Sequence, residues 1–216
     1  MADGQQGLAD LLEIPGFTGE RQLQRIYNLV QLQSRVGDCL EIGCWAGRTA
    51  ACIARAMEAR TTGLSPPERL YLIDPCNDRE VPDYEQGLKA KWGMPDDVSE
   101  LVIENVKKYG STSVPVELIV HTSQEAKAAD VIPRTLRFAF IDGDHYLAGC
   151  LHDCQWALSL MLQGGILALD DYSAPHWGVR EVTELLKEDP RFLTEELHDP
   201  AGTETPCMAI LQFGPL

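Results

Sequence analysis

The sequence predicts one α/β domain with a doubly wound, mostly parallel sheet of seven strands, the last of them antiparallel, and helices on both faces. Short apolar runs and helical stretches alternate five times along the 216 residues, which is typical of βα units that lie side by side in a parallel sheet. The two final apolar runs, 192–197 and 207–213, are joined by a short link that begins Asp199-Pro200, and such a link suits a hairpin rather than a helical crossover. Hydrophobic residues make up 44% of the chain and charged residues 24%, as in an ordinary globular domain.

The hydrophobic periodicity predicts each element in turn. Leu23, Ile26 and Val30 stand at helical spacing and predict a helical cover over residues 1–36. The core is expected over 37–213, with strands at 39–42, 70–73, 116–120, 136–141, 165–169, 192–197 and 207–213. Helices are expected at 48–59, from 123, at 146–162 and from about 177. Between these elements, the less regular stretch 76–114 holds helical segments at 84–92 and 98–109, and it is expected to form an insertion or lid.

The charge balance limits the partners. Eighteen Lys and Arg stand against 33 Asp and Glu, which gives a formal net charge of −15. Binding to nucleic acid depends on cationic contacts with phosphates, so this balance argues against DNA or RNA as a partner. Docking on anionic lipid is disfavoured for the same reason. A small molecule is the expected substrate, and a homodimer is left open.

The cysteines predict a reducing compartment. Their number, seven, is odd, no Cys-x-x-Cys occurs, and most of them stand in apolar runs where a free cysteine packs as a small hydrophobe. The sequence also shows no basic-then-apolar leader and no apolar run near the ~20 residues that span a bilayer. A cytoplasmic location without membrane contact is therefore expected.

A glycine-bearing turn follows the first expected strand. In the run Glu41-Ile42-Gly43-Cys44-Trp45-Ala46-Gly47, the two glycines permit a tight turn and the close approach of a ligand to the backbone before a helix begins. Trp45 stands where the dinucleotide motif G-x-G-x-x-G has its second glycine, and its ring leaves little room for a pyrophosphate. The segment is therefore either a turn that binds an uncharged or cationic ligand or a plain βα turn.

Two further strand ends carry polar residues, and ligands of open α/β sheets bind at such ends. Asp74 ends the second strand, where a carboxylate can accept hydrogen bonds from the two hydroxyls of a ribose. The alternative is a turn or cap aspartate before Pro75. Ser123 and Gln124 follow the third strand and are placed to read the edge of an adenine, although Ser123 also suits the N-cap of the next helix.

The fourth and fifth strands end in the acidic residues Asp142, Asp170 and Asp171. Neighbouring parallel strands lie about 5 Å apart, so the three carboxylates are expected to converge. Together they would repel one another, and a divalent cation that prefers oxygen ligands, Mg²⁺ or Mn²⁺, removes this repulsion. The alternative is a set of turn and cap residues. His145 and His176 follow these strand ends and are the two candidate proton acceptors.

Taken together, Glu41-x-Gly43-x-x-x-Gly47, Asp74, Ser123-Gln124, Asp142 and Asp170-Asp171 resemble the Mg²⁺-dependent class I S-adenosylmethionine O-methyltransferases, whose sheet is Rossmann-like. The catechol and caffeoyl-CoA enzymes and the macrolide-sugar methyltransferases are the most similar groups. The runs Ile-Asp-Gly-Asp-His-Tyr and Asp-Asp-Tyr are most similar to the sugar and natural-product branch. The resemblance extends over residues 37–213.

This resemblance implies a role for each strand end. It implies that the methionine part of the cofactor is held by the turn residues Glu41, Gly43, Trp45, Gly47 and Thr49. It also implies that Asp74 binds the ribose, that Ser123 and Gln124 contact the adenine, and that Asp142 borders this pocket. The implied metal ligands are Asp142, Asp170 and Asp171.

The implied reaction is methyl transfer to a hydroxyl group of a small molecule, namely a sugar, a polyketide glycoside or a catechol-like natural product. His145 stands where the catechol enzymes use a lysine base, and an imidazole is a weaker base, so the choice between His145 and His176 stays open. Two other functions stay open as well. One is an S-adenosylmethionine-dependent N-methyltransferase whose acids bind an amine without metal, and the other is a nucleotide-binding oxidoreductase on a similar fold.

Overall fold

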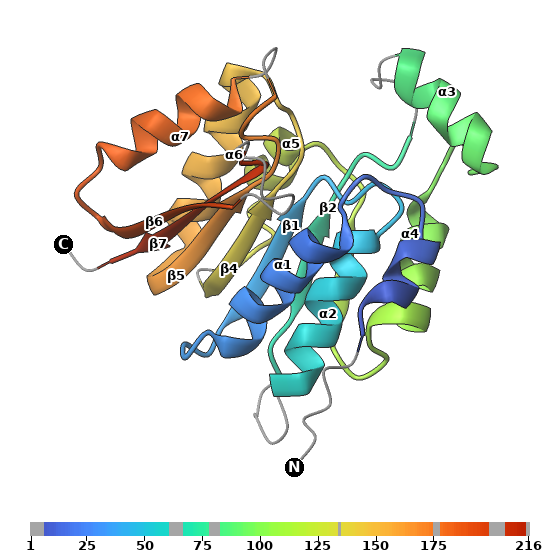
Figure 1. Ribbon diagram of the computed structural model, residues 1–216, viewed down its shortest axis with the longest axis horizontal. Helices are drawn as coiled ribbons and strands as arrows, with labels where there is room; N and C mark the ends of the chain where they lie inside the picture. Colours follow the sequence, from blue (N-terminus) through green and yellow to red (C-terminus); the bar gives the residue numbers. More distant parts are fainter. Residues whose placement is uncertain are drawn as a thin grey trace.

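The sheet of the computed structural model has seven strands in the order β3-β2-β1-β4-β5-β7-β6 (Figure 1). The structure describes residues 7–60, 67–77, 83–133, 135–174, 178–198 and 206–214. Strands β1 to β5 pair in parallel, and β7 runs antiparallel between β5 and β6. The predicted α/β class with a mostly parallel sheet is confirmed. The strands are β1 (Asp38–Ile42), β2 (Leu70–Ile73), β3 (Val116–Ile119), β4 (Leu136–Ile141), β5 (Met161–Leu169), β6 (Phe192–His198) and β7 (Met208–Phe213).

Helices cover both faces of this sheet, because alternate residues of its strands point to opposite faces. On β4, Phe138 and Phe140 pack with one apolar cluster, which includes α1, α2 and α4, whereas Ala139 and Ile141 pack with a second, which includes α5, α6 and α7 (Figure 1). None of the helices in the described part of the chain combines the length and the apolar character that crossing a bilayer requires. The helices are η1 (Ala9–Glu13), α1 (Glu20–Leu32), α2 (Arg48–Arg60), α3 (Asp83–Trp92), α4 (Ser99–Asn105), η2 (Val106–Gly110), α5 (Ser123–Ala128), α6 (Leu147–Leu160) and α7 (Val179–Lys187).

The end of one helix and the cap of another differ from those that the sequence predicts, whereas α5 starts at Ser123 as expected. The helix expected over 146–162 ends at Leu160. Strand β5 starts at the next residue, because Met161 pairs with Leu136 of β4, and the register of the two strands shifts after this pair. The cap of α5 is Thr122 rather than Ser123. The Thr122 hydroxyl accepts from the backbone N–H of Glu125, whose carboxylate accepts from the backbone N–H of Thr122, so the two form a capping box.

The strand order fixes where a ligand can bind. Strand β1 lies between β2 and β4, so the chain leaves β1 toward one edge of the sheet and later returns to fill the other side. Loops that diverge in this way open a crevice at the carboxyl ends of the two strands. The turn that begins at Gly43 and the loop that begins at Asp142 follow β1 and β4, so both lie at this crevice.

Candidate active site

The glycine turn lies directly against the end of β4. The φ angle of Gly43 is 83°, and a Cβ atom there would lie 2.1 Å from the carbonyl oxygen of Asp142, so only glycine fits. Gly47, at the start of α2, also has a positive φ of 85°. Between them Trp45 has a φ of 48°, an unusual value for a bulky residue. Such strain gathers at binding sites, which favours the ligand-binding interpretation of this turn.

Asp74 holds the turn in place. Its Oδ2 accepts hydrogen bonds from the backbone N–H groups of Cys44 (2.8 Å) and Trp45 (3.0 Å), and its Oδ1 accepts from the N–H of Cys76 (2.7 Å). The residue is therefore a turn aspartate, as one of the two interpretations of the sequence had it. A carboxylate has about four acceptor positions, so capacity is left for a ligand hydroxyl and the ribose role stays a prediction.

Glu41 is a buried acid at the end of β1. Only 1% of its surface is exposed, and its Oε2 has no hydrogen-bond partner among the described residues. Burial, and then the charges of Asp142 and Asp74, raise the pKa of Glu41 well above its usual range. Leaving a buried carboxylate oxygen without a partner is costly, and a cationic ligand group at this point would remove that cost.

The other residues expected at the cofactor lie after β1 and β3 and make contacts of their own. Ser123 is buried at the first position of α5, and its hydroxyl donates to Oε1 of Gln124 (3.3 Å). Thr49 lies on the first turn of α2, where its hydroxyl hydrogen-bonds with that of Thr18 (3.1 Å). Thr49 thus ties α2 to the N-terminal segment, while Ser123 and Gln124 lie after β3, where an adenine contact was predicted.

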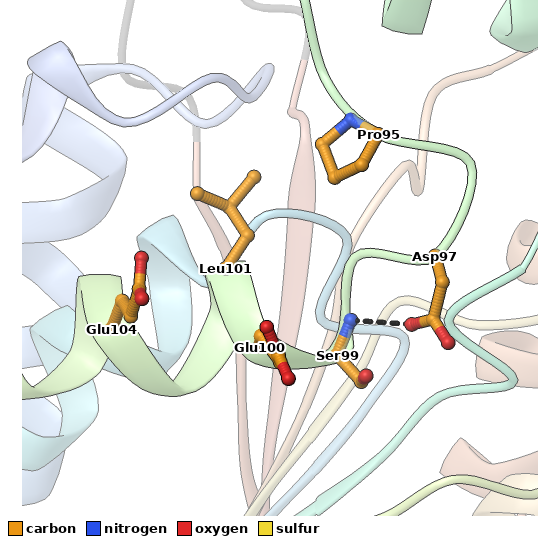
Figure 2. Close-up of a pocket in the computed structure, with 6 residues that line it drawn as sticks. All are labelled: Pro95, Asp97, Ser99, Glu100, Leu101 and Glu104. Atoms are coloured by element: carbon orange, nitrogen blue, oxygen red, sulfur yellow. Dashed lines mark hydrogen bonds between the residues drawn. The ribbon is translucent and has the colours of Figure 1, made fainter.

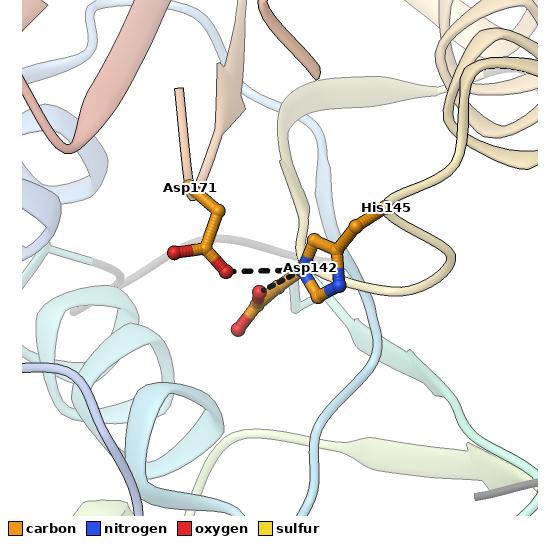
Figure 3. A group of neighbouring side chains, drawn as sticks. All are labelled: Asp142, His145 and Asp171. Carbon is orange, nitrogen blue, oxygen red and sulfur yellow. Dashed lines mark hydrogen bonds and ion pairs between the residues drawn. The ribbon is translucent and has the colours of Figure 1, made fainter. Parts of the chain in front are cut away.

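The strand ends bring Asp142, His145 and Asp171 together (Figure 3). One donor atom from each of them lies within 4.8 Å of the others, an arrangement that suits a metal ion. His145 Nε2 is 3.1 Å from Oδ1 of Asp142 and 3.2 Å from Oδ2 of Asp171. Asp171 has a φ of 57°, a left-handed conformation that only a few non-glycine residues adopt. The three side chains are half-buried, so a substrate can reach them.

Asp170 departs from the predicted convergence. It lies outside the group of three donors, and its Oδ1 instead accepts from the Nε2 of Gln22 (2.5 Å) and from the backbone N–H of Asp171 (2.9 Å). Both residues follow the end of β5 at Leu169, and the left-handed φ of 57° at Asp171 turns the chain between them, so the two side chains do not share one direction. Asp170 nevertheless adjoins the group, because its charge acts on His145 and the charges of Asp142 and Asp171 act on it.

Burial and the neighbouring charges shift the pKa values of the group. Burial would lower the pKa of His145, but its hydrogen bond to Asp142 and the charges of Asp142, Asp171 and Asp170 outweigh burial and raise it to about 9. Burial and then the charge of Asp142 raise the pKa of Asp171 to about 6. Burial, followed by the charges of Asp142 and Asp171, raises the pKa of Asp170 well above its usual range. The protonated imidazole thus supplies positive charge between carboxylates.

These shifts predict that the metal-free protein loses stability as the pH rises. The pKa of Asp171 increases on folding from 3.8 to about 6, and that of His145 from 6.5 to about 9. The native state then binds more protons than the unfolded chain, so the free energy of unfolding falls as pH rises through both ranges. In EDTA, the melting temperature should drop by several degrees between pH 6.5 and 9, and the drop should be smaller in His145→Gln. Equal slopes for both proteins would contradict this assignment.

Neither the second candidate base nor a surface pocket adds a described residue to the group of three donors. His176 lies outside the described residues. The surface pocket, at the start of α4, contains none of the predicted site residues (Figure 2). One of its acids, Asp97, accepts a hydrogen bond from the backbone N–H of Ser99 (2.9 Å). This pocket is lined by Pro95, Asp97, Ser99, Glu100, Leu101 and Glu104.

An aromatic cluster covers the glycine turn. The ring of Trp45 lies 6.2 Å from that of Phe17, on the N-terminal segment, and 6.4 Å from that of Trp92, at the end of α3. The Lys89 ammonium lies 5.5 Å from the centre of the Trp45 ring. The N-terminal segment and α3 thus both reach the turn, as a cover and a lid would.

Sequence reasoning missed the residues that join the N-terminal segment to the site. Gln22 reaches Asp170, and the Arg48 guanidinium donates to the backbone carbonyls of Ile14 (2.8 Å) and Thr18 (2.8 Å). One signal was available, because Gln22 is a polar residue next to the core position Leu23 on a helix that buries one face. Its partner, 148 positions away, had no signal in the sequence.

The fold is also found in solved methyltransferase structures. An O-methyltransferase from Bacillus cereus, solved in complex with SAH, is 20% identical with a TM-score of 0.60, over 100% of this chain and 93% of that chain. TomG, an O-methyltransferase from Streptomyces achromogenes involved in tomaymycin synthesis and solved in complex with SAM, is 18% identical with a TM-score of 0.58, over 99% and 92%. CalS11, a TDP-rhamnose 3′-O-methyltransferase in calicheamicin biosynthesis, is 19% identical with a TM-score of 0.61, over 98% and 81%. At these identities the likeness shows the fold alone.

A family model shows more than the fold. Among curated proteins, no sequence match is found. The model described as a methyltransferase domain, however, matches residues 40–172, more than half of the chain. The matched segment runs from β1 to the end of β5 and includes the glycine turn, Asp74, Asp142, His145 and both acids after β5. The chain therefore belongs to the methyltransferase-domain family and is a methyltransferase.

Proposed function

We propose that this protein transfers the methyl group of S-adenosylmethionine to a hydroxyl group of a small molecule with the assistance of Mg²⁺ or Mn²⁺. The observation that carries the proposal is the group Asp142, His145 and Asp171, whose first two members follow the end of β4 that lies against Gly43. Acidic metal ligands, a proton acceptor and the cofactor turn then share one crevice. An in-line methyl transfer needs this proximity, since positioning supplies much of its acceleration.

The residues around the turn fit the cofactor. The unpartnered Oε2 of Glu41 suits the α-ammonium group of the methionine part, and Asp74 suits the ribose hydroxyls. Ser123 and Gln124 would contact the adenine after β3. Support comes from the relatives from Bacillus cereus and Streptomyces achromogenes, which were solved with SAH and SAM.

Glu41→Gln should weaken S-adenosylmethionine binding by roughly 10- to 100-fold, which is the loss expected when one charge-assisted hydrogen bond is removed. The substitution keeps the size of the side chain and removes the charge that would face the ammonium group. Isothermal titration calorimetry of both proteins measures this change. Glu117→Gln is a matched control on β3, because Glu117 pairs with the exposed Arg69 instead. Unchanged affinity in Glu41→Gln would remove Glu41 from the cofactor site.

The acidic group fits a hard divalent cation. Carboxylate oxygens are the ligands that Mg²⁺ and Mn²⁺ prefer. Burial, and then the neighbouring carboxylates, raise the pKa values of Asp170 and Asp171, and a bound cation would stabilise their ionised forms. Asp142 and Asp171 would hold the ion, with Asp170 beside them. When bound, the metal lowers the pKa of a substrate hydroxyl and so favours an alkoxide nucleophile near neutral pH.

His145 is the proton acceptor in this proposal. Its Nε2 faces Asp142 and Asp171, and its backbone carbonyl accepts from the N–H of Gly178 (2.8 Å), which ties the loop to the start of α7. Imidazole is a poor ligand for Mg²⁺ compared with oxygen, so His145 serves better as a base than as a ligand. With a cation held by Asp142 and Asp171, the His145 imidazole would no longer need its own proton between the acids and would be able to accept the proton of the substrate hydroxyl.

The acceptor is proposed to be a sugar, a polyketide glycoside or a catechol-like natural product. The solved relative CalS11 acts on TDP-rhamnose, which supports the sugar class. Incubating the protein with methyl-deuterated S-adenosylmethionine, Mg²⁺ and a panel of these compounds should yield a product heavier by one trideuteromethyl group in place of a hydrogen. Mass spectrometry detects this gain and locates it on oxygen. A gain on nitrogen alone would reject the hydroxyl acceptor.

A further inference from the structure

Gln22 brings the N-terminal segment into the acidic site. It lies on the first turn of α1, only 6% of its surface is exposed, and its Nε2 donates to Oδ1 of Asp170 at 2.5 Å. Its neighbour Leu23 is fully buried, as are Ile26 and Val30 further along the helix. The helix is thus fixed to the core beside Gln22, and the amide has little freedom to leave Asp170.

The first residues of α2, the helix that follows the glycine turn, hold the same N-terminal segment in place. Arg48, the first residue of α2, donates to the carbonyls of Ile14 and Thr18, and the hydroxyl of Thr18 pairs with that of Thr49. Four residues after Thr18 the chain reaches Gln22. The start of α1 is therefore positioned by the helix that follows the proposed cofactor turn, and it reaches Asp170 from there.

The chemistry of this contact suits a ligand carboxylate. Among the described residues, the hydrogen bonds to Asp170 both end on Oδ1, one from Gln22 and one from the N–H of Asp171. No hydrogen bond from a described residue reaches its Oδ2, and the two bonds to Oδ1 fix the plane of the Asp170 carboxylate, which lies beside the three donors. An amide donor does so without bringing a positive charge, whereas an arginine or lysine here would neutralise Asp170 and compete with the metal.

We propose that Gln22 is a positioning residue of the metal site: it orients Asp170 through Oδ1 and so makes metal binding depend on the N-terminal segment. This inference rests on the proposed metal-assisted function. Outer hydrogen bonds of this kind orient metal ligands, and their loss typically weakens metal binding by roughly 10- to 100-fold.

The test measures Mn²⁺ affinity by electron paramagnetic resonance, which reports free Mn²⁺ directly and needs no acceptor. Gln22→Met keeps the length of the side chain and removes the donor, and it should weaken Mn²⁺ binding by roughly tenfold or more. Affinity for S-adenosylmethionine, measured by calorimetry on the same samples, should stay within about twofold of wild type. The matched control is Gln24→Ala, which removes an amide of the same helix that bonds Asn28 instead, and it should leave both affinities unchanged.

A second arm separates positioning from a general effect on the fold. In the Asp170→Asn background, Gln22→Met should weaken Mn²⁺ binding much less than it does in wild type, because its effect passes through Asp170. If Gln22→Met does not fold, Gln22→Asn keeps an amide that is one carbon too short to reach, and the same weakening is expected. Wild-type Mn²⁺ affinity in Gln22→Met would overturn the role of Gln22 and leave the proposed function intact. A wild-type protein that binds no Mn²⁺ would overturn both.

Discussion

Asp142→Asn is expected to lower kcat by at least about 10³-fold. Asp142 contributes a carboxylate to the proposed metal site and the hydrogen bond that orients His145, at 3.1 Å. Removing one preorganised electrostatic group costs roughly 10²–10³-fold, and impairing a general base costs roughly 10²–10⁴-fold. Because one substitution affects both, its effect should exceed either alone. Initial rates at saturating cofactor and Mg²⁺ measure it.

Asp144→Asn provides the control for charge alone. Asp144 stands two residues away in the same loop, is exposed, and accepts a hydrogen bond from the backbone N–H of Tyr146 that an asparagine side chain can retain. Its substitution should change kcat by less than about threefold, as surface changes generally do. If the two variants lose activity equally, the loss reflects the charge of the loop and not the position of Asp142. Affinity for S-adenosylmethionine should fall less than kcat in Asp142→Asn, although Asp142 borders the cofactor turn.

His145→Ala is expected to lower kcat by roughly 10²–10⁴-fold while cofactor affinity stays near that of wild type. The imidazole lies between Asp142 and Asp171, which follow β4 and β5, whereas the glycine turn follows β1. Added imidazole should restore part of the rate, because a small base can enter the space that the side chain leaves. In wild type the rate should rise with pH as the base loses its proton, and in His145→Ala this rise should be absent.

Substitutions of two other histidines test whether the loss of activity is specific to His145. His152→Ala, on α6, removes an imidazole that pairs with Asp153 (3.1 Å) outside the acidic group, and it should leave kcat nearly unchanged. His176→Ala tests the second base that the sequence offers. Loss of activity in His176→Ala together with near-normal activity in His145→Ala would exchange the two roles.

The sequence was sufficient for the framework, because local patterns encode it. Alternating apolar runs predicted the parallel strands, and Gly43 with Gly47 predicted a tight turn, in which both glycines have a positive φ. Strand adjacency predicted that Asp142 and Asp171 converge, which the group of three donors confirms. These features depend on neighbours in sequence or on the pairing of adjacent strands, both of which hydrophobic patterns indicate.

The sequence was insufficient for features that depend on the direction of a side chain or on contacts between residues far apart in the chain. It predicted that Asp170 joins the same group as Asp171, but Asp170 lies outside the group of three donors and accepts a hydrogen bond from Gln22 instead. The sequence indicated Ser123 as a possible N-cap of α5. The observed N-cap is Thr122, one residue earlier, because Glu125 stands three positions after Thr122 and completes a capping box with it. The contact of Gln22 with Asp170 depends on how α1 packs, and no local pattern carries that information.

The central claim is that a divalent ion at the acidic site drives methyl transfer to oxygen. The most direct measurement is the initial rate of methyl transfer by metal-stripped protein in excess EDTA, with Mg²⁺ or Mn²⁺ then added back beyond the chelator. We predict that transfer stops in EDTA and that either ion restores it, while S-adenosylmethionine binding persists throughout. Full transfer by the stripped protein in excess EDTA would contradict the claim, and the acids would then serve to bind an amine acceptor without metal.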